Sequence, residues 1–266
     1  MSRIDKRFEE LAAHGRKALV TYLTAGDPNI DISEAILTTV SEAGADILEI
    51  GVPFSDPLAD GPSIQAAAHR ALDAGVRLPE VFGLVERLRS RIDTPIVLMT
   101  YFNPVQKFGM DRFAADAAHA GVDGVIMTDL PPEEAGDWKR IADTAGLSTI
   151  FLLAPTSTEK RIRRVADMAT GFIYCVSRTG VTGVREEVPA ELQALIHTIR
   201  QYTDKPVAVG FGISKPEHVK QVTQWADGAV VGSALIDLIT RDGAEEELLA
   251  AVHKFVRELK QAGEVI

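Results

Sequence analysis

The apolar run Ile47–Gly51 contains a single acidic residue, Glu49, whose position suits proton transfer. Side chains alternate along a strand, so Glu49 shares a face with Ile47 and Gly51. If that face is buried, desolvation raises the carboxyl pKa toward neutrality, and such a group suits general acid–base catalysis. A structural glutamate that is hydrogen-bonded to its neighbours is the alternative. Glu49 is therefore the first candidate catalytic residue.

The loop that follows this run carries two more carboxylates. Residues 52–62 read Val-Pro-Phe-Ser-Asp-Pro-Leu-Ala-Asp-Gly-Pro, with the acidic groups at Asp56 and Asp60. Each aspartate precedes a proline or a glycine, which is also the pattern of an ordinary turn. Three prolines would stiffen this loop, and the loop could fold over a site. The spacing alone does not decide which aspartate, if either, is catalytic.

Glycine-rich segments near the end of the chain predict an anion site. They are Ser177–Gly183, Gly210–Ser214 and Gly232–Leu235. Glycines let backbone N–H groups converge on an anion, and a short helix opening near Ser233 would add a favourable dipole. Plain tight turns are the alternative. We expect a phosphate site. Such a local site would bind an anion even though the chain as a whole has a formal net charge of −10.

Several other chemistries lack the residues that they need. No lysine lies in the C-terminal half of any predicted strand, so a Schiff-base mechanism has no nucleophile. The six histidines are scattered, which speaks against a metal site or a histidine base. The single cysteine, Cys175, excludes an internal disulfide and a cysteine-built zinc site, and we expect it to be a small buried residue.

Charge and hydropathy narrow the range of partners. Lys and Arg total 28 against 38 Asp and Glu, with no basic run, which disfavours nucleic acid and anionic membrane surfaces. The longest stretch without a charge or a histidine, Thr144–Thr158, has 15 residues, whereas a membrane span needs about 20. The first ten residues are too charged for a secretory leader. We therefore expect a cytoplasmic protein.

The elements that must position these groups are eight short apolar runs separated by amphipathic helical patterns. The runs are 18–23, 47–51, 96–99, 124–127, 149–153, 172–176, 207–209 and 228–232. They are too uniformly apolar for strands with one wet face, so both faces should be covered, as in a parallel sheet. Eight β-α units favour an α/β fold, a single (βα)8 TIM barrel domain over residues 1–266. An open doubly wound sheet is the alternative.

Short signals at the starts of strands add detail to this barrel. Ala43–Asp46, Ala120–Asp123 and Trp225–Asp227 each lead into an apolar run, and the first two contain a glycine that should stop a helix. Residues 2–14 predict an extra N-terminal helix that covers the N-terminal end of the barrel. Its apolar face would hold Ile4, Phe8, Leu11 and Ala12.

Aromatic side chains stand at or just past several strand ends, where a barrel has its active site. They are Tyr22, Tyr101, Tyr174 and Phe211, which could line an apolar pocket or merely pack. Taken together, the residues predict a metal-free barrel enzyme that binds a phosphorylated ligand and uses a buried glutamate and a loop aspartate for proton transfer.

Five segments resemble the tryptophan synthase alpha chain family. They are Leu48–Pro62, Tyr101–Pro104, Ser177–Gly183, Val209–Ser214 and Val231–Ala234, in order over nearly the whole chain. The first is long enough to be highly specific. The resemblance implies cleavage of indole-3-glycerol phosphate to indole and glyceraldehyde 3-phosphate in tryptophan biosynthesis, without a cofactor in this chain.

The same resemblance assigns roles to individual residues. Glu49 matches the family's acid–base, and Asp60 matches the carboxylate that accepts a hydrogen bond from the indole N–H. The phosphate cradle matches Gly183, Gly212, Gly232 and Ser233, and pocket positions match Tyr174, Thr182 and Phe211. Tyr22 stands where phenylalanine is expected and Thr179 where alanine is common, so the detailed shape of the pocket could differ.

The resemblance also implies a partner, the pyridoxal-phosphate-dependent beta chain, in an alpha-beta-beta-alpha heterotetramer that channels indole. The regions that match its contacts are Pro53–Pro62, which contains Asp56 and Pro57, then Asn103–Pro104, and Thr179–Glu187, which contains Gly180 and directly follows Arg178. Alternatives are another phosphate-binding barrel lyase or isomerase, a non-catalytic activator of the beta chain, and a passive phosphate-binding protein. An indole-glycerol-phosphate synthase should have a lysine at a strand end, and this chain has none there.

Overall fold

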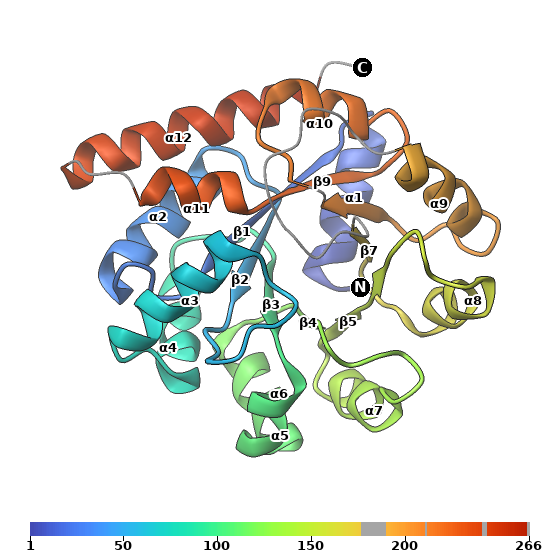
Figure 1. Cartoon of the computed structure of the whole chain (residues 1–266), viewed down its shortest axis with the longest axis horizontal. Coiled ribbons are helices and arrows are strands. Elements are labelled where there is room, and N and C mark those ends of the chain that lie inside the picture. The colour runs from blue at the N-terminus through green and yellow to red at the C-terminus, as the bar shows by residue number, and fades with distance from the viewer. Residues whose placement is uncertain (177–189, 211, 241–243, 265–266) are drawn as a thin grey trace.

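The computed structural model describes residues 1–176, 190–210, 212–240 and 244–264. Helices surround a parallel sheet that curves round on itself (Figure 1). The helices are α1 Arg3–Ala13, α2 Ile30–Glu42, α3 Pro62–Asp73, α4 Leu78–Arg89, α5 Phe102–Phe108, α6 Met110–Ala120, α7 Gly136–Thr144, α8 Glu159–Met168, α9 Ala190–Arg200, α10 Pro216–Val222, α11 Ser233–Ile239 and α12 Glu245–Ala262.

The strands confirm the predicted (βα)8 barrel, with one difference in their number. They are β1 Ala18–Thr24, β2 Ile47–Gly51, β3 Ile96–Thr100, β4 Gly124–Met127, β5 Ser148–Ile150, β6 Leu152–Leu153, β7 Ile173–Val176, β8 Val207–Gly210 and β9 Gly228–Val231. The order is β5-β4-β3-β2-β1-β9-β8-β7-β6, with every neighbouring pair parallel.

The run predicted at 149–153 divides into β5 and β6 because it changes partner at Phe151. Ile150 is in register with Ile126 of β4, whereas Leu152 is in register with Tyr174 of β7. This one segment therefore joins the two ends of the strand order and closes the barrel.

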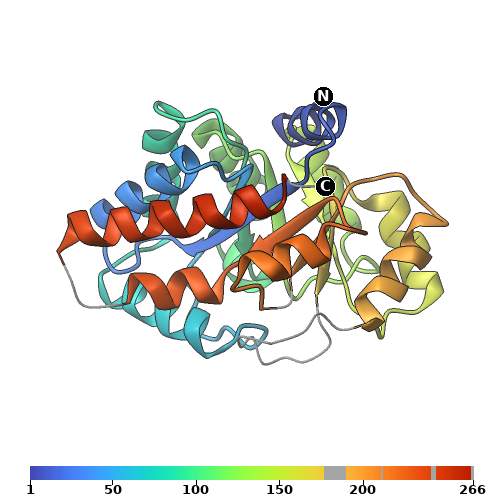
Figure 2. The same ribbon diagram turned by 90° about the horizontal axis from the view of Figure 1, so that it is seen from above.

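The predicted N-terminal helix covers one end of the barrel. The Ser2 hydroxyl caps α1 by accepting from the Asp5 N–H at 3.1 Å. Ile4, Phe8 and Leu11 are buried against the inner layer of barrel side chains. Ala12 was expected on the same face but is exposed, since it lies on the last turn beyond the contact. Figure 2 shows α1 at the end opposite to α3 and the loop before it.

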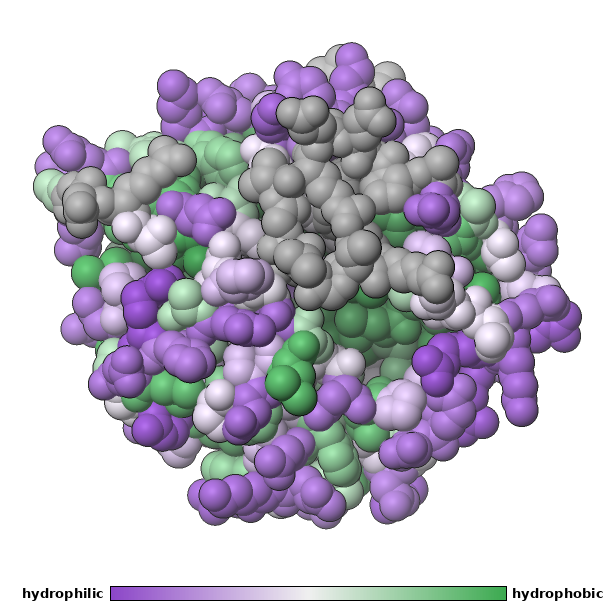
Figure 3. Space-filling model, in the orientation of Figure 1, coloured by the Kyte–Doolittle hydropathy of each residue, from purple (hydrophilic) through white to green (hydrophobic). Residues whose placement is uncertain are grey.

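The opposite face carries the C-terminal ends of the strands. Figure 3 shows that most of its described surface is hydrophilic, with an apolar hollow near the centre. Among the described residues, no helix combines the length and the apolar character that a membrane crossing requires.

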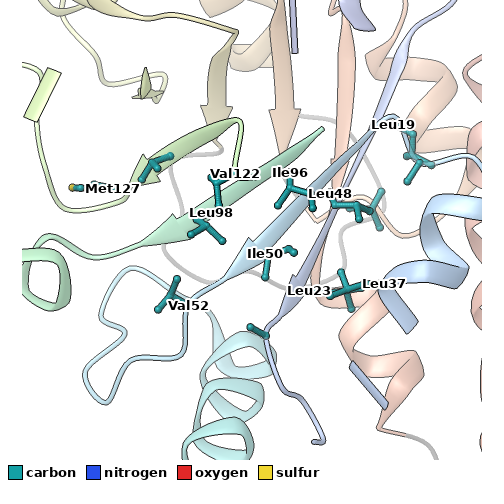
Figure 4. Close-up of a cluster of buried hydrophobic side chains, with 14 of the residues drawn as sticks. Leu19, Leu23, Leu37, Leu48, Ile50, Val52, Ile96, Leu98, Val122 and Met127 are labelled. Atoms are coloured by element: carbon teal, nitrogen blue, oxygen red, sulfur yellow. The ribbon is translucent and has the colours of Figure 1, made fainter. Parts of the chain in front are cut away.

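The core has an inner and an outer layer, as the alternation along β2 predicts. Ile47 packs inside the barrel with α1, whereas Leu48 and Ile50 point outward to the helices. Figure 4 shows this outer layer, in which Leu48, Ile50 and Leu98 of the strands belong to the same buried cluster as Leu37 of α2. Because both faces of each strand are covered, Glu49, on the inner face, has no direct route to solvent along its strand.

The aspartates of the repeated signal fix the strand starts. Each accepts a hydrogen bond from a backbone N–H on the neighbouring strand: Asp46 from Leu19 at 2.7 Å, Asp123 from Ile96 at 2.8 Å, and Asp227 from Val207 at 2.9 Å. The preceding glycines have φ of +108° at Gly44 and +96° at Gly121, which confirms the expected helix stops.

Each of these aspartates also meets a cation. Lys260 donates to Asp46 at 2.7 Å, Arg89 and Arg3 each donate to Asp123 at 2.9 Å, and Arg200 and Lys17 pair with Asp227. At the N-terminal end of the barrel, each of these three carboxylates is therefore paired with both a backbone N–H and a cationic side chain.

Candidate active site

A cavity of about 610 Å³ opens at the C-terminal ends of the strands. Its described wall comes from β1 to β4 and β6 to β9 and from the loops and helices that follow them. It contains Glu49 and Asp60 among mainly apolar neighbours such as Ile64, Ile126 and Leu153. A concave apolar site with few polar groups at this end of the barrel is where such folds place their chemistry.

Glu49 lies inside the barrel and is 1% exposed. Neither of its carboxyl oxygens has a hydrogen-bond partner among the described residues, and neither is accessible to solvent. Burial, with a smaller contribution from the charge of Asp60, raises the pKa of Glu49 to about 8. A carboxyl without a partner costs free energy in a folded protein, so this group is poised to exchange a proton with a bound molecule.

Asp60, rather than Asp56, reaches the cavity. Asp60 is 9% exposed, and burial raises its pKa to about 6, although a hydrogen bond from Tyr101 opposes this shift. Asp56 is exposed and accepts a hydrogen bond from the Ser55 hydroxyl at 2.6 Å. The structure therefore separates two residues that their spacing alone does not distinguish.

Tyr101 supports Asp60 from behind. Its hydroxyl donates to Asp60 Oδ2 at 3.0 Å and accepts from the Ala59 N–H at 3.0 Å. From the sequence we expect Tyr101 in the substrate pocket. In the structure, however, Tyr101 is not part of the described cavity wall. Burial, and then the charge of Asp60, raises the pKa of this phenol, which therefore stays protonated as a donor.

Tyr22 and Tyr174 line the cavity together with Glu49, and Tyr22 is in register with Glu49 on the neighbouring strand. A Cβ placed on Gly51 would overlap the Tyr22 hydroxyl, and one on Gly210 would lie 2.8 Å from the Tyr174 hydroxyl. Each tyrosine therefore needs the glycine on the adjacent strand. The Tyr22 hydroxyl lies 3.3 Å from Thr24 Oγ1, and burial raises the pKa of both phenols.

Three of the four expected phosphate-binding residues lie together. Gly212, Gly232 and Ser233 border the cavity after β8 and β9. The predicted short helix, α11, starts at Ser233 directly after β9, and Gly232 and Ser233 at its N-terminal end line the cavity. Gly212 has φ of +94°, a conformation that other residues rarely adopt.

Several expected residues lie outside the described part of the chain. They are Gly183 of the phosphate cradle, Thr182 and Phe211 of the pocket, and Arg178, Gly180 and the rest of the 179–187 partner loop. Of the other partner positions, Asp56 and Asn103 are exposed, whereas Pro57 is buried. Leu58, beside Pro57, is 91% exposed and stands out from the same loop.

Gln65 is a site residue that the sequence does not single out. It lies in the first turn of α3, and its Nε2 donates to the carbonyl oxygen of Asp60 at 2.7 Å. A lone glutamine near the start of a helix carries no recognisable signal, and only the folded loop brings it to Asp60.

Metal ligands and the single thiol were the other groups that the sequence offers for chemistry. No three His, Cys, Asp or Glu side chains in the described ranges are grouped closely enough to hold a metal ion. Cys175 is buried as expected, and burial raises the pKa of its thiol to about 12. Arg161 is the only cation in the described cavity wall, and it pairs with Glu133 at 3.3 Å.

Comparison with known proteins gives one consistent result. The sequence profile of the family described as tryptophan synthase alpha chain matches residues 8–264. The tryptophan synthase alpha chain of Geobacter sulfurreducens is 54% identical over 262 residues, which cover 98% of this chain and 99% of that protein. That of Thermoanaerobacter sp. is 46% identical over 261 residues, with 98% and 99% covered.

Solved structures agree. The tryptophan synthase subunit alpha of Legionella pneumophila superimposes with a TM-score of 0.91 at 38% identity, covering 100% of both chains. A chain of Mycobacterium tuberculosis tryptophan synthase superimposes with a TM-score of 0.93 at 38% identity, covering 100% of this chain and 99% of the other.

Proposed function

The chain belongs to the tryptophan synthase alpha chain family, and we propose that its cavity cleaves indole-3-glycerol phosphate into indole and glyceraldehyde 3-phosphate. As a member of that family it is a lyase of tryptophan biosynthesis. The observation that carries the proposal is the state of Glu49, which is buried in the cavity without a hydrogen-bond partner and has a pKa raised to about 8.

Glu49 is the proposed acid–base. In its protonated form it gives a proton to C3 of the indole ring, which places positive charge on the ring nitrogen. The carboxylate that remains takes the proton of the side-chain hydroxyl next to the ring. The electron pair of that O–H bond forms the aldehyde, and the pair of the breaking carbon–carbon bond restores the aromatic ring. Glu49 ends the cycle protonated, as it began.

Asp60 is the proposed acceptor of the indole N–H. With its pKa raised only to about 6, it is ionised at neutral pH while Glu49 is still protonated. A carboxylate at that nitrogen stabilises the positive charge as it develops, which is electrostatic catalysis in a site sheltered from water. Two carboxyls with different pKa values can therefore divide the two tasks.

The rest of the cavity binds the substrate in this proposal. Gly212, Gly232 and Ser233, with Gly183, hold the phosphate through backbone N–H groups. The ring pocket is formed by Tyr22 and Tyr174 with Thr182 and Phe211, and Tyr101 acts through Asp60. No cofactor or metal is required in this chain, because the proton transfers above need only its carboxyls.

The proposed partner is the tryptophan synthase beta chain, with pyridoxal phosphate bound in that chain. An alpha-beta-beta-alpha assembly would receive indole directly from the cavity. The exposed loop with Asp56 and Leu58, the α5 residue Asn103, and Arg178 and Gly180 are the proposed contacts, together with Pro57. The reaction would take place in the cytoplasm.

Indole release tests this function. The purified chain is incubated with indole-3-glycerol phosphate, with and without the beta chain, beside Glu49→Gln. We expect release by the parent and release at least about a hundredfold slower by the variant, since the amide cannot donate and then accept the proton. No release by the parent, even with a competent beta chain, would overturn the assigned reaction. Equal release by the variant would remove Glu49 from it.

A further inference from the structure

The tip of the loop between β2 and α3 (residues 52–61) is largely exposed. Ser55, Asp56, Leu58 and Ala59 are exposed, yet Asp60 must be held in the cavity. We propose that Gln65 is a positioning residue for Asp60, whose side-chain amide fixes the backbone of this loop. The inference rests on the proposed function, in which Asp60 contacts the substrate.

The amide of Gln65 closes the end of the loop. Its Nε2 donates to the Asp60 carbonyl oxygen at 2.7 Å and lies 3.4 Å from the Pro57 carbonyl oxygen. The Asp60 N–H also donates to the Pro57 carbonyl at 3.0 Å, so one donor group lies against both ends of the turn 57–60. Both acceptors are backbone atoms, so the contact depends on loop conformation and not on the side chains that the loop carries.

Tyr101 holds the same turn from the other side. Its hydroxyl contacts the Ala59 N–H and the Asp60 carboxylate, each at 3.0 Å. The carboxylate is thus fixed through its side chain by Tyr101 and through its backbone by Gln65. A carboxylate that must meet a ring N–H needs both, because a shift of about 1 Å in a catalytic group can lower a rate by about 10²-fold.

Gln65 can act as a fixed point because α3 is itself anchored. Arg70 on this helix makes two hydrogen bonds to Asp27, at 2.7 and 2.8 Å, and Asp27 is 2% exposed. Ile64, next to Gln65, packs in a buried cluster with Tyr22 and also lines the cavity. The helix therefore connects the loop to β1 and to the wall around Glu49.

Two substitutions of similar length separate a positioning role from a merely structural one. Gln65→Met keeps the length and removes the donor. Gln65→Glu replaces the donor with a carboxylate that faces two carbonyl oxygens and adds a negative charge near Asp60. Gln221→Met, on the exposed surface of α10, is the matched control.

We expect kcat to fall about tenfold in Gln65→Met and further in Gln65→Glu, with the control unchanged. The added charge raises the pKa of Asp60, so the acid limb of the pH profile moves to higher pH in Gln65→Glu. A purely structural role gives the opposite order, since an acidic residue in the first turn of a helix stabilises it. In that case Gln65→Glu would melt no lower than the parent and turn over at least as fast as Gln65→Met, and the proposal would be overturned.

Amide hydrogen exchange at Ala59 and Asp60 tests the inference apart from the reaction. We expect faster exchange at both positions in both Gln65 variants and no change in Gln221→Met. Unchanged exchange would overturn the role of Gln65 even if activity fell. Failure of the parent to release indole with the beta chain would instead overturn the proposed function, while the exchange result would still decide whether Gln65 holds the loop.

Discussion

Both ends of the barrel bury carboxylates, but they treat them differently. At the N-terminal end Asp46 and Asp123 are 4% and 6% exposed, and at the C-terminal end Glu49 and Asp60 are 1% and 9% exposed. Burial raises the pKa of Asp46, and Lys260 and the Leu19 N–H oppose this rise without cancelling it. Glu49 has no such compensation. Burial alone therefore does not distinguish the two ends; Glu49 differs from Asp46 because its oxygens have no described hydrogen-bond partner.

The largest expected effect is on turnover at the C-terminal end. Glu49→Gln should lower the rate of indole release by about 10²–10⁴-fold, the usual contribution of a general acid–base. The measurement is steady-state indole release with the beta chain present. A fall of less than about tenfold would mean that Glu49 resembles the paired carboxylates of the other end.

The same variant should be more stable than the parent in alkaline solution. The pKa of Glu49 is raised from 4.5 to about 8, so its contribution to stability is complete below pH 4.5 and is lost as the pH rises through 8. The amide does not titrate, so at a pH of about 9 we expect Glu49→Gln to gain roughly 2–5 kcal/mol in free energy of unfolding relative to the parent. Urea unfolding at a pH of about 5 and of about 9 measures this difference.

At the N-terminal end the expected effect is on stability instead. Asp123→Ala removes the acceptor for the Ile96 N–H and leaves Arg89, whose side chain is 14% exposed, without its carboxylate. Breaking such a buried pair costs about 3–5 kcal/mol, while kcat of the folded fraction stays unchanged. Asp137→Ala is the control, because Asp137 pairs with Arg140 on the surface, where the two side chains are 81% and 72% exposed. Equal losses in the two variants would refute the contrast.

The pH dependence of kcat/KM is a finer test of the site. The reaction needs Asp60 ionised and Glu49 protonated, so the profile should be bell-shaped with limbs near 6 and 8. Activity falls about tenfold for each pH unit beyond either limb. Because the two carboxyls interact, these limbs belong to the pair. A profile that stays flat up to a pH of about 10 would show that Glu49 does not work in its protonated form.

The smallest expected effect concerns the support of Asp60. Tyr101→Phe removes a hydrogen bond that lowers the pKa of Asp60, so the acid limb should move to higher pH. The loss of this bond should lower kcat/KM at neutral pH by about three- to tenfold. Stopped assays across a pH series measure both changes, and a limb that stays in place would limit Tyr101 to fixing the loop.

The strands, the extra helix and the inward position of Glu49 could be predicted from sequence because each is a local property. Uniformly apolar runs indicate covered strands, and the two-residue period places Glu49 with Ile47. The repeated aspartate also has a local cause, since each one completes the hydrogen bonding of the neighbouring strand start. These patterns need no knowledge of distant residues.

The choice between Asp56 and Asp60 could not be made from spacing, because it depends on contacts across the fold. Tyr101 is 41 residues from Asp60, and no sequence period links them. Gln65 is close in sequence, but its hydrogen bond exists only when the loop has folded. The division of the 149–153 run at Phe151 likewise reflects the closure of the barrel, in which one segment serves two neighbours.

The helix α1 makes the two ends of the barrel different, because it closes one of them. The N-terminal end of the barrel is blocked by Ile4, Phe8 and Leu11, which pack against the inner barrel residues. The described cavity is therefore closed on the side of α1. In the proposed reaction, indole formed beside Glu49 would leave at the C-terminal ends of the strands, where the described cavity opens. A protein bound over that opening would therefore receive the product, although α1 itself lies at the opposite end of the barrel.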